Sequence, residues 1–315
     1  MKKIINLLLV FSYLSVNAQM GCTDANANNF NPLAKQNNGT CTYNPSTQVV
    51  TEIGSLLPMV PESSGITYEN GFIYTHGDSG NPSTFYKNDA STGALLQTIN
   101  ITNFTNDDWE EITSDENYFY IGDFGNNNGA RTNLRVLRVS KSQFINNVTS
   151  NVDVTAEAIY FSYADQTSFA VNPLNNFDCE SMISVGNFLY LFTKNRGDGQ
   201  TKVYKLSKNP GTYSLSIHST YNVGGLLTAA DYNTTSNEIV LLGYLLPNFK
   251  NSFLYYLKDF STDQFFSGNV RRVEIGNSVN TWQTEGICYK NTSEIFISCE
   301  TKTLSDAKLF LTNKN

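Results

Sequence analysis

The sequence predicts an all-β fold, a five-bladed β-propeller closed by a strand from near the N-terminus. Aromatic residues make up 13% of the chain, and they suit the half-buried pleated surfaces of sheets. Only 8 prolines and 16% charged residues argue against disorder. One layout, a polar residue beside a hydrophobic pair before a turn and a Tyr/Phe-rich strand, recurs every 45 to 70 residues or so, as in radial sheet repeats. Its five copies are Ser64-Gly65-Ile66-Thr67, Glu110-Glu111-Ile112-Thr113, Glu180-Ser181-Met182-Ile183, Ala230-Asp231-Tyr232-Asn233 and Glu285-Gly286-Ile287-Cys288.

Residues 1–18 have the layout of a secretory signal peptide. Lys2 and Lys3 supply positive charge, residues 4–14 the apolar run and residues 16–18 the small-residue cleavage site. The apolar run is too short to span a bilayer, and we expect no membrane span elsewhere. Lipid attachment at Cys22 is the alternative, but Gln19 stands where a lipidation sequence has Leu. The sequence therefore predicts a secreted or periplasmic protein.

Residues 19–46 form a separate segment, rich in Asn, Asp and Gly, in which we expect no regular structure. Cys22 and Cys41 bracket it, and an exported protein can form a disulfide there that contributes on the order of 3 kcal/mol. The segment resembles the GCTDxxAxNYNPxAxxDDGSC modules of secreted Bacteroidota proteins, which are similar to calcium-binding thrombospondin type 3 repeats. Here Asn37-Asn38 replaces the acidic pair and Asp24 is the remaining carboxylate, which favours a disulfide-stapled spacer over a calcium site.

Residues 47–315 divide into five units, four of which have four expected strands. The strands cover 64–68, 71–76, 83–87 and 94–101; 111–114, 117–122, 133–139 and 156–162; 180–184, 187–193, 201–206 and 213–221; 228–232, 238–243, 253–258 and 269–275; and 285–289, 294–299 and 307–312. The last unit lacks a fourth strand, and residues 47–53 have no unit of their own. Pairing these residues with the last sheet would close the ring and protect its edges. A sixth blade would need strands in residues 163–178, where Asn and Pro occur without alternation.

A propeller brings the starts of its first strands and the ends of its second strands to one face near the axis. The expected first strands start with the acidic residues Glu110, Glu180, Asp231 and Glu285. At a nearly constant spacing from the hydrophobic residue of each first strand, the second strands end in His76 and Asp78, Asp123, Lys194 and Asn195, and Glu300. We therefore expect these side chains to line one acidic funnel.

Carboxylates gathered around one axis repel one another, so they need a cation, a basic side chain or raised pKa values. Calcium or magnesium would satisfy them, because hard cations prefer oxygen ligands. The expected metal ligands are Asp78, Glu110, Asp123, Glu180, Glu285 and Glu300. The competing interpretation is that the acids at the strand starts only cap backbone amides between blades.

A small or sugar-like ligand in the funnel is the second expectation, since Lys194 can pair with the acids while a neutral molecule binds above them. Trp109 and Trp282 precede glutamates of the inner ring, and their planes either stack on a sugar or belong to the core between blades. The expected ligand-contacting residues are His76, Trp109, Asn195, Arg196, Asp231 and Trp282.

Other features of the chain carry less functional information. A net charge of −7 disfavours nucleic acid as a partner. The stretch 77–80 copies a protease nucleophile motif, but His76 lies too close in sequence to serve a triad there. Cys179, Cys288 and Cys299 are expected to be buried free thiols, with a bridge between the last two as the alternative.

Five strings resemble, as a set, a family of secreted propeller-like proteins of Bacteroidota, which often carry a C-terminal sorting domain for type IX secretion. The strings are Asp108-Trp109-Glu110-Glu111-Ile112, Gly122-Asp123-Phe124-Gly125-Asn126-Asn127, Asp178-Cys179-Glu180-Ser181-Met182, Leu191-Phe192-Thr193-Lys194-Asn195 and Thr284-Glu285-Gly286-Ile287. The resemblance covers nearly all of residues 60–302 and implies the propeller fold, without an assigned activity. Because no sorting domain follows the last strand, we expect export from the cytoplasm, and passage across the outer membrane is not indicated.

Three functions remain open at this point. The first is a secreted binding propeller that holds a divalent cation, a small or sugar-like ligand, or both. The second is a metal-dependent hydrolase of lactones, esters or phosphoesters, in which Glu110 and Glu180 supply the catalytic carboxylates and Lys194 stabilises developing negative charge. The third is a surface interaction scaffold. The sequence does not identify the metal, the ligand or the oligomeric state.

Overall fold

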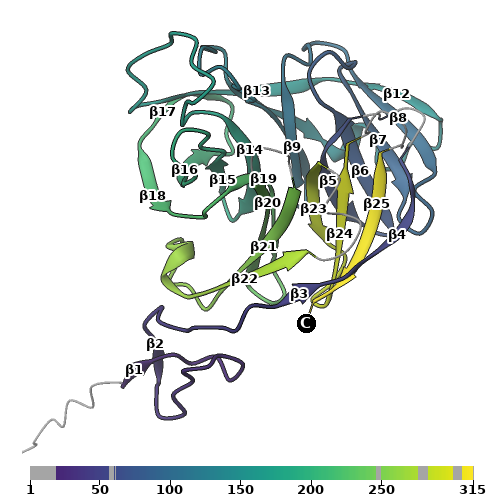
Figure 1. Ribbon diagram of the computed structural model, residues 1–315. Coiled ribbons are helices and arrows are strands. Elements are labelled where there is room, and N and C mark those ends of the chain that lie inside the picture. The colour runs from purple at the N-terminus through teal and green to yellow at the C-terminus, as the bar shows by residue number, and fades with distance from the viewer. Residues whose placement is uncertain are drawn as a thin grey trace, which may run out of the picture.

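The computed structural model describes residues 19–56, 60, 62–245, 250–275, 283–300 and 307–314. The expected signal peptide and Trp282 lie outside these residues. Five sheets stand around one axis as the blades of a propeller, and a small N-terminal module lies beside the ring (Figure 1). Among the described residues no helix is long and apolar enough to cross a membrane.

The blades follow one another in chain order, and each starts with its innermost strand. Blade 1 contains β5 (Ser63–Glu69), β6 (Phe72–Gly77), β7 (Thr84–Asp89), β8 (Leu95–Ile101) and β12 (Asn151–Val154). Blade 2 contains β9 (Trp109–Ser114), β10 (Tyr118–Asp123), β11 (Arg135–Ser140), β13 (Ala156–Tyr163) and β17 (Gly211–Leu215). Blade 3 contains β14 (Cys179–Val185), β15 (Phe188–Thr193), β16 (Thr201–Ser207) and β18 (Ile217–Tyr221). Blade 4 contains β19 (Leu226–Asn233), β20 (Glu238–Leu245), β21 (Lys250–Lys258), β22 (Asn269–Ile275) and β3 (Thr47–Gln48). Blade 5 contains β23 (Thr284–Tyr289), β24 (Glu294–Cys299), β25 (Lys308–Asn313) and β4 (Val50–Ser55).

The five innermost strands contact one another in sequence, and β23 contacts β5, so the ring is closed. The core lies between the blades, because a blade is hydrophobic on both faces and needs a neighbour on each side. Phe85 of blade 1, for example, packs against Phe119 of blade 2 with ring centroids 5.8 Å apart. The stack of sheets is thus held by aromatic and aliphatic contacts around the axis.

The N-terminal strand closes the ring as predicted. Strand β4 pairs antiparallel with β25 and becomes the fourth strand of blade 5, while the preceding β3 pairs parallel with β22 of blade 4. Residues 164–178 contain no strand, so the number of blades is five.

Two outer strands differ from the predicted pattern. The strand expected at 213–221 is interrupted at Ser216: β17 joins blade 2, parallel to β13, and β18 remains in blade 3. The sequence analysis did not predict β12, which pairs parallel with β8 of blade 1. Both strands cover an outer edge that would otherwise present unpaired backbone groups. Residue alternation does not indicate which of two neighbouring blades such an edge strand joins.

The N-terminal module contains the short parallel pair β1 (Met20–Gly21) and β2 (Gln36–Asn37), and the predicted disulfide joins Cys22 to Cys41. It contacts the propeller through Asn37, whose Nδ2 donates to Oδ1 of Asn269 at 2.6 Å. Cys179, Cys288 and Cys299 are buried free thiols, so no bridge joins the last two.

Candidate metal and ligand site

A β-bulge occurs at the same place on all five innermost strands, where each faces the end of the second strand of its blade. An extra residue at a bulge redirects its side chain out of the regular alternation. The bulged residues are Ser64, Glu110, Glu180, Thr228 and Glu285. They ring one end of the axis, which we call the acidic mouth.

The second strands bring further charged residues to the same mouth. The backbone amides of Asp78, Lys194 and Glu300 donate to carbonyl groups just ahead of the bulges, at 3.2, 2.9 and 3.0 Å. Each residue therefore follows its strand end at an equivalent position. The side chains of Asp78 and Glu300 influence each other electrostatically, and both influence Glu285. The structure thus brings together six of the predicted residues, Asp78, Glu110, Glu180, Lys194, Glu285 and Glu300.

Three carboxylates cluster between blades 1 and 2. Asp78, Asp108 and Glu110 each offer an oxygen, and these atoms lie within 4.8 Å of one another. Burial and the neighbouring carboxylate of Asp78 raise the pKa of Asp108 to about 7, while burial and nearby acids raise the pKa of Glu110 well above its usual range. Oγ of Ser64 donates to Oε2 of Glu110 at 3.1 Å. The sequence analysis had not selected Asp108, although it precedes the bulge by only two residues.

Gly125 leaves the space in which these carboxylates lie. Its amide donates to the carbonyl of Asp108 at 3.2 Å. A Cβ atom at this position would collide with Oε1 of Glu110 and Oδ2 of Asp108. Only glycine allows the backbone of blade 2 to approach the acidic side chains so closely.

Blade 3 contributes an ion-paired side of the mouth. Nζ of Lys194 forms a salt bridge with Oε2 of Glu180, and both side chains are almost fully buried. Nε of Arg196 lies 2.9 Å from Oδ2 of Asp178, and its Nη2 lies 3.5 Å from Oε1 of Glu180. The charge of the mouth is therefore uneven, since the bases lie on blade 3 and the clustered acids on blades 1 and 2.

Blade 5 adds two acids. Burial raises the pKa of Glu285 to about 7, although Lys194 opposes this shift. Burial and the charge of Asp78 raise the pKa of Glu300 to about 8. The hydroxyl of Tyr244 donates to Oε1 of Glu285 at 3.4 Å. Near neutral pH these carboxyls are therefore partly protonated unless a cation binds nearby.

Asp123 lies outside the cluster of Asp78, Asp108 and Glu110. Its two oxygens form ion pairs with Nη2 of Arg131 at 2.9 Å and Nη2 of Arg135 at 2.7 Å. Asp123 is the last residue of β10, one residue earlier than the position that faces the mouth, and a shift of one residue turns a side chain to the other face. Its role in the structure is to hold the two arginines beside the loop that carries Asp108.

Asn195 has internal partners as well. It is buried, with Oδ1 accepting from Oγ1 of Thr193 at 2.6 Å and Nδ2 donating to Oδ1 of Asp198 at 3.0 Å. These contacts fix the turn after β15. Of the polar residues predicted at this turn, Lys194 and Arg196 are those in contact with the acids of the mouth.

Asp231 lies at the opposite end of the ring, and its predicted position in the funnel was wrong. The bulge of blade 4 is at Thr228, whose Oγ1 donates to the carbonyl of Thr284 at 2.9 Å. The sequence analysis placed the bulge position of this blade at Asp231, three residues after Thr228. The reason is that β19 begins as a run of small and apolar residues without a distinctive polar start.

His76 and Trp109 are core residues. Both are fully buried, and their rings meet edge to face with centroids 5.7 Å apart. Burial lowers the pKa of His76 to about 4, so its ring is neutral at physiological pH. Of the two interpretations of Trp109, the structure agrees with packing between blades.

Glu111 closes the axis below the acidic mouth. The amides of Ile112 and Ala230 donate to its two carboxyl oxygens, both at 3.0 Å, so the side chain reaches from β9 to β19. Burial raises its pKa well above the usual range. Sequence analysis had noted the Glu110-Glu111 pair without giving the second residue a role. The other blades carry the small residues Gly, Ser or Ala at this position. A single large acidic residue among small ones is the feature from which sequence comparison could have singled out Glu111.

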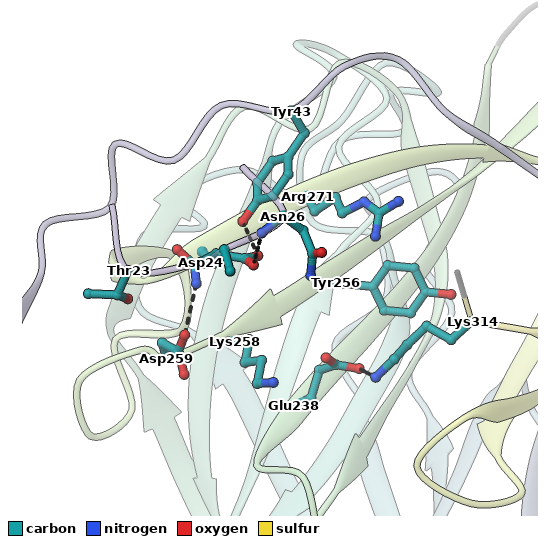
Figure 2. A pocket seen from close by; sticks show the side chains of 12 residues that line it. Thr23, Asp24, Asn26, Tyr43, Glu238, Tyr256, Lys258, Asp259, Arg271 and Lys314 are labelled. Atoms are coloured by element: carbon teal, nitrogen blue, oxygen red, sulfur yellow. Dashed lines mark hydrogen bonds and ion pairs between the residues drawn. The ribbon is translucent and has the colours of Figure 1, made fainter. Parts of the chain in front are cut away.

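The N-terminal module presents no comparable group of ligands. Figure 2 shows Asp24 between Tyr43 and Asn26, whose hydroxyl and backbone amide donate to its carboxylate at 2.8 and 2.9 Å. The surrounding cavity of about 280 Å³ also includes Asp259 and Arg271 of blade 4. Within the described part of the chain, the cluster at the acidic mouth is the one group of carboxylates whose oxygens lie close enough together to share a metal ion.

Comparison with known proteins supports the fold alone. No known protein family and no curated protein matches the chain. The structure of an exo-β-1,3-galactanase from Phanerochaete chrysosporium with β-1,3-galactotriose is similar, with a TM-score of 0.52 and 11% identity over 86% of this chain and 65% of that one. This chain therefore spans just under two thirds of the galactanase chain.

Two further solved structures are more weakly similar. One is a putative oxidoreductase (glucose dehydrogenase) from Thermus thermophilus, with a TM-score of 0.47 and 7% identity over 84% of this chain and 99% of that one. The other is a putative 6-phosphogluconolactonase from Bacteroides uniformis, with a TM-score of 0.39 and 10% identity over 79% and 67%. The resemblance to a Bacteroidota secretion family remains a prediction.

Proposed function

We propose that this is an exported binding propeller whose acidic mouth holds a divalent cation, with a small polar or sugar-like ligand bound over it. The observation that carries the proposal is the cluster of Asp78, Asp108 and Glu110, whose oxygens lie within 4.8 Å of one another. Among the described residues, no lysine or arginine forms an ion pair with Asp78 or Glu110, and Arg131 approaches Asp108 only to 4.0 Å. A cation would relieve this repulsion and lower the raised pKa values of these carboxyl groups.

The donor set favours calcium, with magnesium as the alternative. All three side chains offer carboxylate oxygens, and hard cations prefer these to imidazole or thiolate ligands. Calcium takes roughly six to eight oxygen ligands, so three carboxylates leave positions for water or for ligand hydroxyl groups. Arg196 on blade 3, whose Nη2 lies 3.5 Å from Oε1 of Glu180, adds a donor group for such a ligand in the mouth.

A metal-dependent hydrolase is the second candidate. It is favoured by the pKa of Glu110, which burial and nearby acids raise well above its usual range, because a carboxyl group that keeps its proton can donate it to a leaving group. The cation would polarise an ester, lactone or phosphoester oxygen, Glu110 or Glu180 would transfer the proton, and Lys194 would stabilise developing negative charge. An interaction scaffold is the third candidate, in which the loops rather than the mouth bind a partner.

Export is part of the proposal. The disulfide between Cys22 and Cys41 agrees with an oxidising compartment such as the periplasm or the exterior. We also propose that the chain is organised as a signal peptide, a module closed by this disulfide and a propeller.

Metal analysis of the purified protein, followed by calcium titration of the EDTA-treated chain, tests the proposal. We expect one cation per chain and a rise in melting temperature, since a ligand at a hundredfold excess over its Kd adds about 2.7 kcal/mol of stability. Asp78→Asn and Glu110→Gln should lose the calcium-induced rise, whereas Asp153→Asn, an exposed acid on β12, should keep it. If calcium and magnesium leave the melting temperature unchanged, the cation site is wrong.

The same variants separate binding from catalysis. Turnover of a lactone, ester or phosphoester that needs calcium and disappears in Glu110→Gln would favour the hydrolase. Retained glycan binding without turnover would favour the binding propeller.

A further inference from the structure

The mouth of the ring opposite the acidic mouth is a cavity of about 280 Å³. All five innermost strands line it, with Thr67 from β5, Thr113 from β9, Ser184 from β14, Asp231 from β19 and Tyr289 from β23. We call it the hydroxyl mouth. Glu111 fills the axis between the two mouths, where it binds the backbone of β19. The cavity is therefore a separate site rather than the far end of the acidic mouth.

The serine and threonine hydroxyl groups that face this cavity from the three strands β5, β9 and β14 have no hydrogen-bond partner in the described part of the protein, whereas the hydroxyls of Tyr232 and Tyr289 are bonded to Asn237 and Glu238. The groups without a partner belong to Thr67, Thr113, Ser114 and Ser184. Thr67 and Thr113 are nevertheless buried, at 6% and 5% exposure. Buried polar groups normally have a partner, either in the protein or in bound solvent or ligand. Three neighbouring strands thus present donors and acceptors to one small space, where solvent or a ligand can bind them.

Asp231 supplies the charged group of the hydroxyl mouth. The amide of Tyr289 donates to its Oδ2 at 2.7 Å and fixes its position. No lysine or arginine among the described residues forms an ion pair with Asp231. Lys290, which lies at the rim of the cavity, pairs with Glu294 at 3.0 Å instead. A fixed carboxylate without a counter-cation can accept hydrogen bonds from the hydroxyl groups of a ligand.

We propose that the hydroxyl mouth binds a small neutral polyol, of monosaccharide size or below, through Asp231 and the hydroxyl groups of Thr67, Thr113 and Ser184. Hydroxyl groups donate and accept, so they match a polyol in both directions. Tyr68 and Tyr232 also line the cavity and offer apolar faces to the CH groups of such a ligand. One carboxylate is too few for a divalent cation, and its charge disfavours anions.

Saturation-transfer difference NMR on the full chain tests this site, with D-glucose, D-galactose, myo-inositol and glycerol as probes at pH 8. We expect at least one probe to give saturation transfer with a millimolar Kd. Asp231→Asn and Thr113→Val, which keep side-chain size, should weaken binding by about tenfold or more, that is by about 1.4 kcal/mol. Asp153→Asn should bind as the unaltered chain does, and a thermal melt of each variant should show that it folds.

The comparison with Glu110→Gln locates the bound polyol. Binding lost in Thr113→Val but kept in Glu110→Gln supports the hydroxyl mouth, whether or not the acidic mouth takes a cation. Binding lost only in Glu110→Gln assigns the polyol to the acidic mouth and overturns the inference. The absence of saturation transfer from all four probes at tens of millimolar overturns it as well.

Discussion

Gly125 determines how much room the carboxylates of the acidic mouth have. Because a Cβ atom there would collide with Glu110 and Asp108, Gly125→Ala should displace both side chains while leaving the blade intact. We expect calcium binding, measured by isothermal titration calorimetry, to weaken by about tenfold or more. Asn128→Ala, an exposed change in the same loop, serves as the control. An unaltered calcium affinity in Gly125→Ala would mean that these two acids do not hold the metal.

The residues of the mouth were predictable only where the spacing of blade residues was regular. Glu110, Glu180 and Glu285 lie at bulges that follow the same hydrophobic pattern, so sequence comparison among the blades placed them together. Asp123 failed because blade 2 reaches the mouth one residue later. Asp231 failed because β19 lacks a polar start. At Asp123, an error of one residue moves the side chain to another face of the sheet, whereas at Asp231 the error of three residues moves it to the other end of the strand.

At the scale of elements, the N-terminal strands join two blades through Gln48. This buried side chain donates to Oγ1 of Thr312 on β25 at 2.9 Å and accepts from the hydroxyl of Tyr256 on β21 at 3.0 Å. Gln48→Ala leaves both buried groups without this partner, which costs about 1–3 kcal/mol. We expect the melting temperature in differential scanning fluorimetry to fall by roughly 2–12 °C, since 1 kcal/mol shifts it by about 2–4 °C in a domain of this size. Val49→Ala, at the exposed neighbouring position, should change it little, and an equal loss in both variants would contradict the role of Gln48.

The elements near the axis were easier to predict than those at the rim. Inner strands such as β10 and β15 are continuous aromatic and aliphatic runs, and their predicted bounds are within about two residues of the structure. The rim strands β12 and β17 are short and partly exposed. Their pairing depends on which edge lies open in the folded ring, and local sequence does not contain that information.

For the whole molecule, the buried acids make stability depend on pH. The pKa values of Asp108 and Glu285 are raised to about 7 and that of Glu300 to about 8, so the folded protein holds more protons than the unfolded chain between about pH 4 and 8. The free energy of unfolding therefore falls as the pH rises through this window. His76 acts in the opposite direction, because its pKa is lowered to about 4, but most of its contribution is reached by pH 6.5.

Calorimetry between pH 6.5 and 8 isolates the effect of the acids. We expect the melting temperature of the EDTA-treated protein to fall by several degrees over this range, and calcium to remove most of the fall. Glu285→Gln combined with Glu300→Gln should flatten the profile without calcium. A melting temperature that rises with pH in the metal-free protein would contradict the proposed protonation of the mouth.

The rim strands also cross between blades, because each pairs with a different blade from the strands that flank it in the chain. The chain leaves blade 2 between β11 and β13 to lay β12 on blade 1, and leaves blade 3 between β16 and β18 to lay β17 on blade 2. Near the other end, β3 and β4 tie blade 4 to blade 5. A blade that opened alone would pull a strand out of the neighbouring sheet, so local opening costs the hydrogen bonds of that sheet as well. Hydrogen exchange at the rim should consequently require the opening of several blades at once, as in a single cooperative unit.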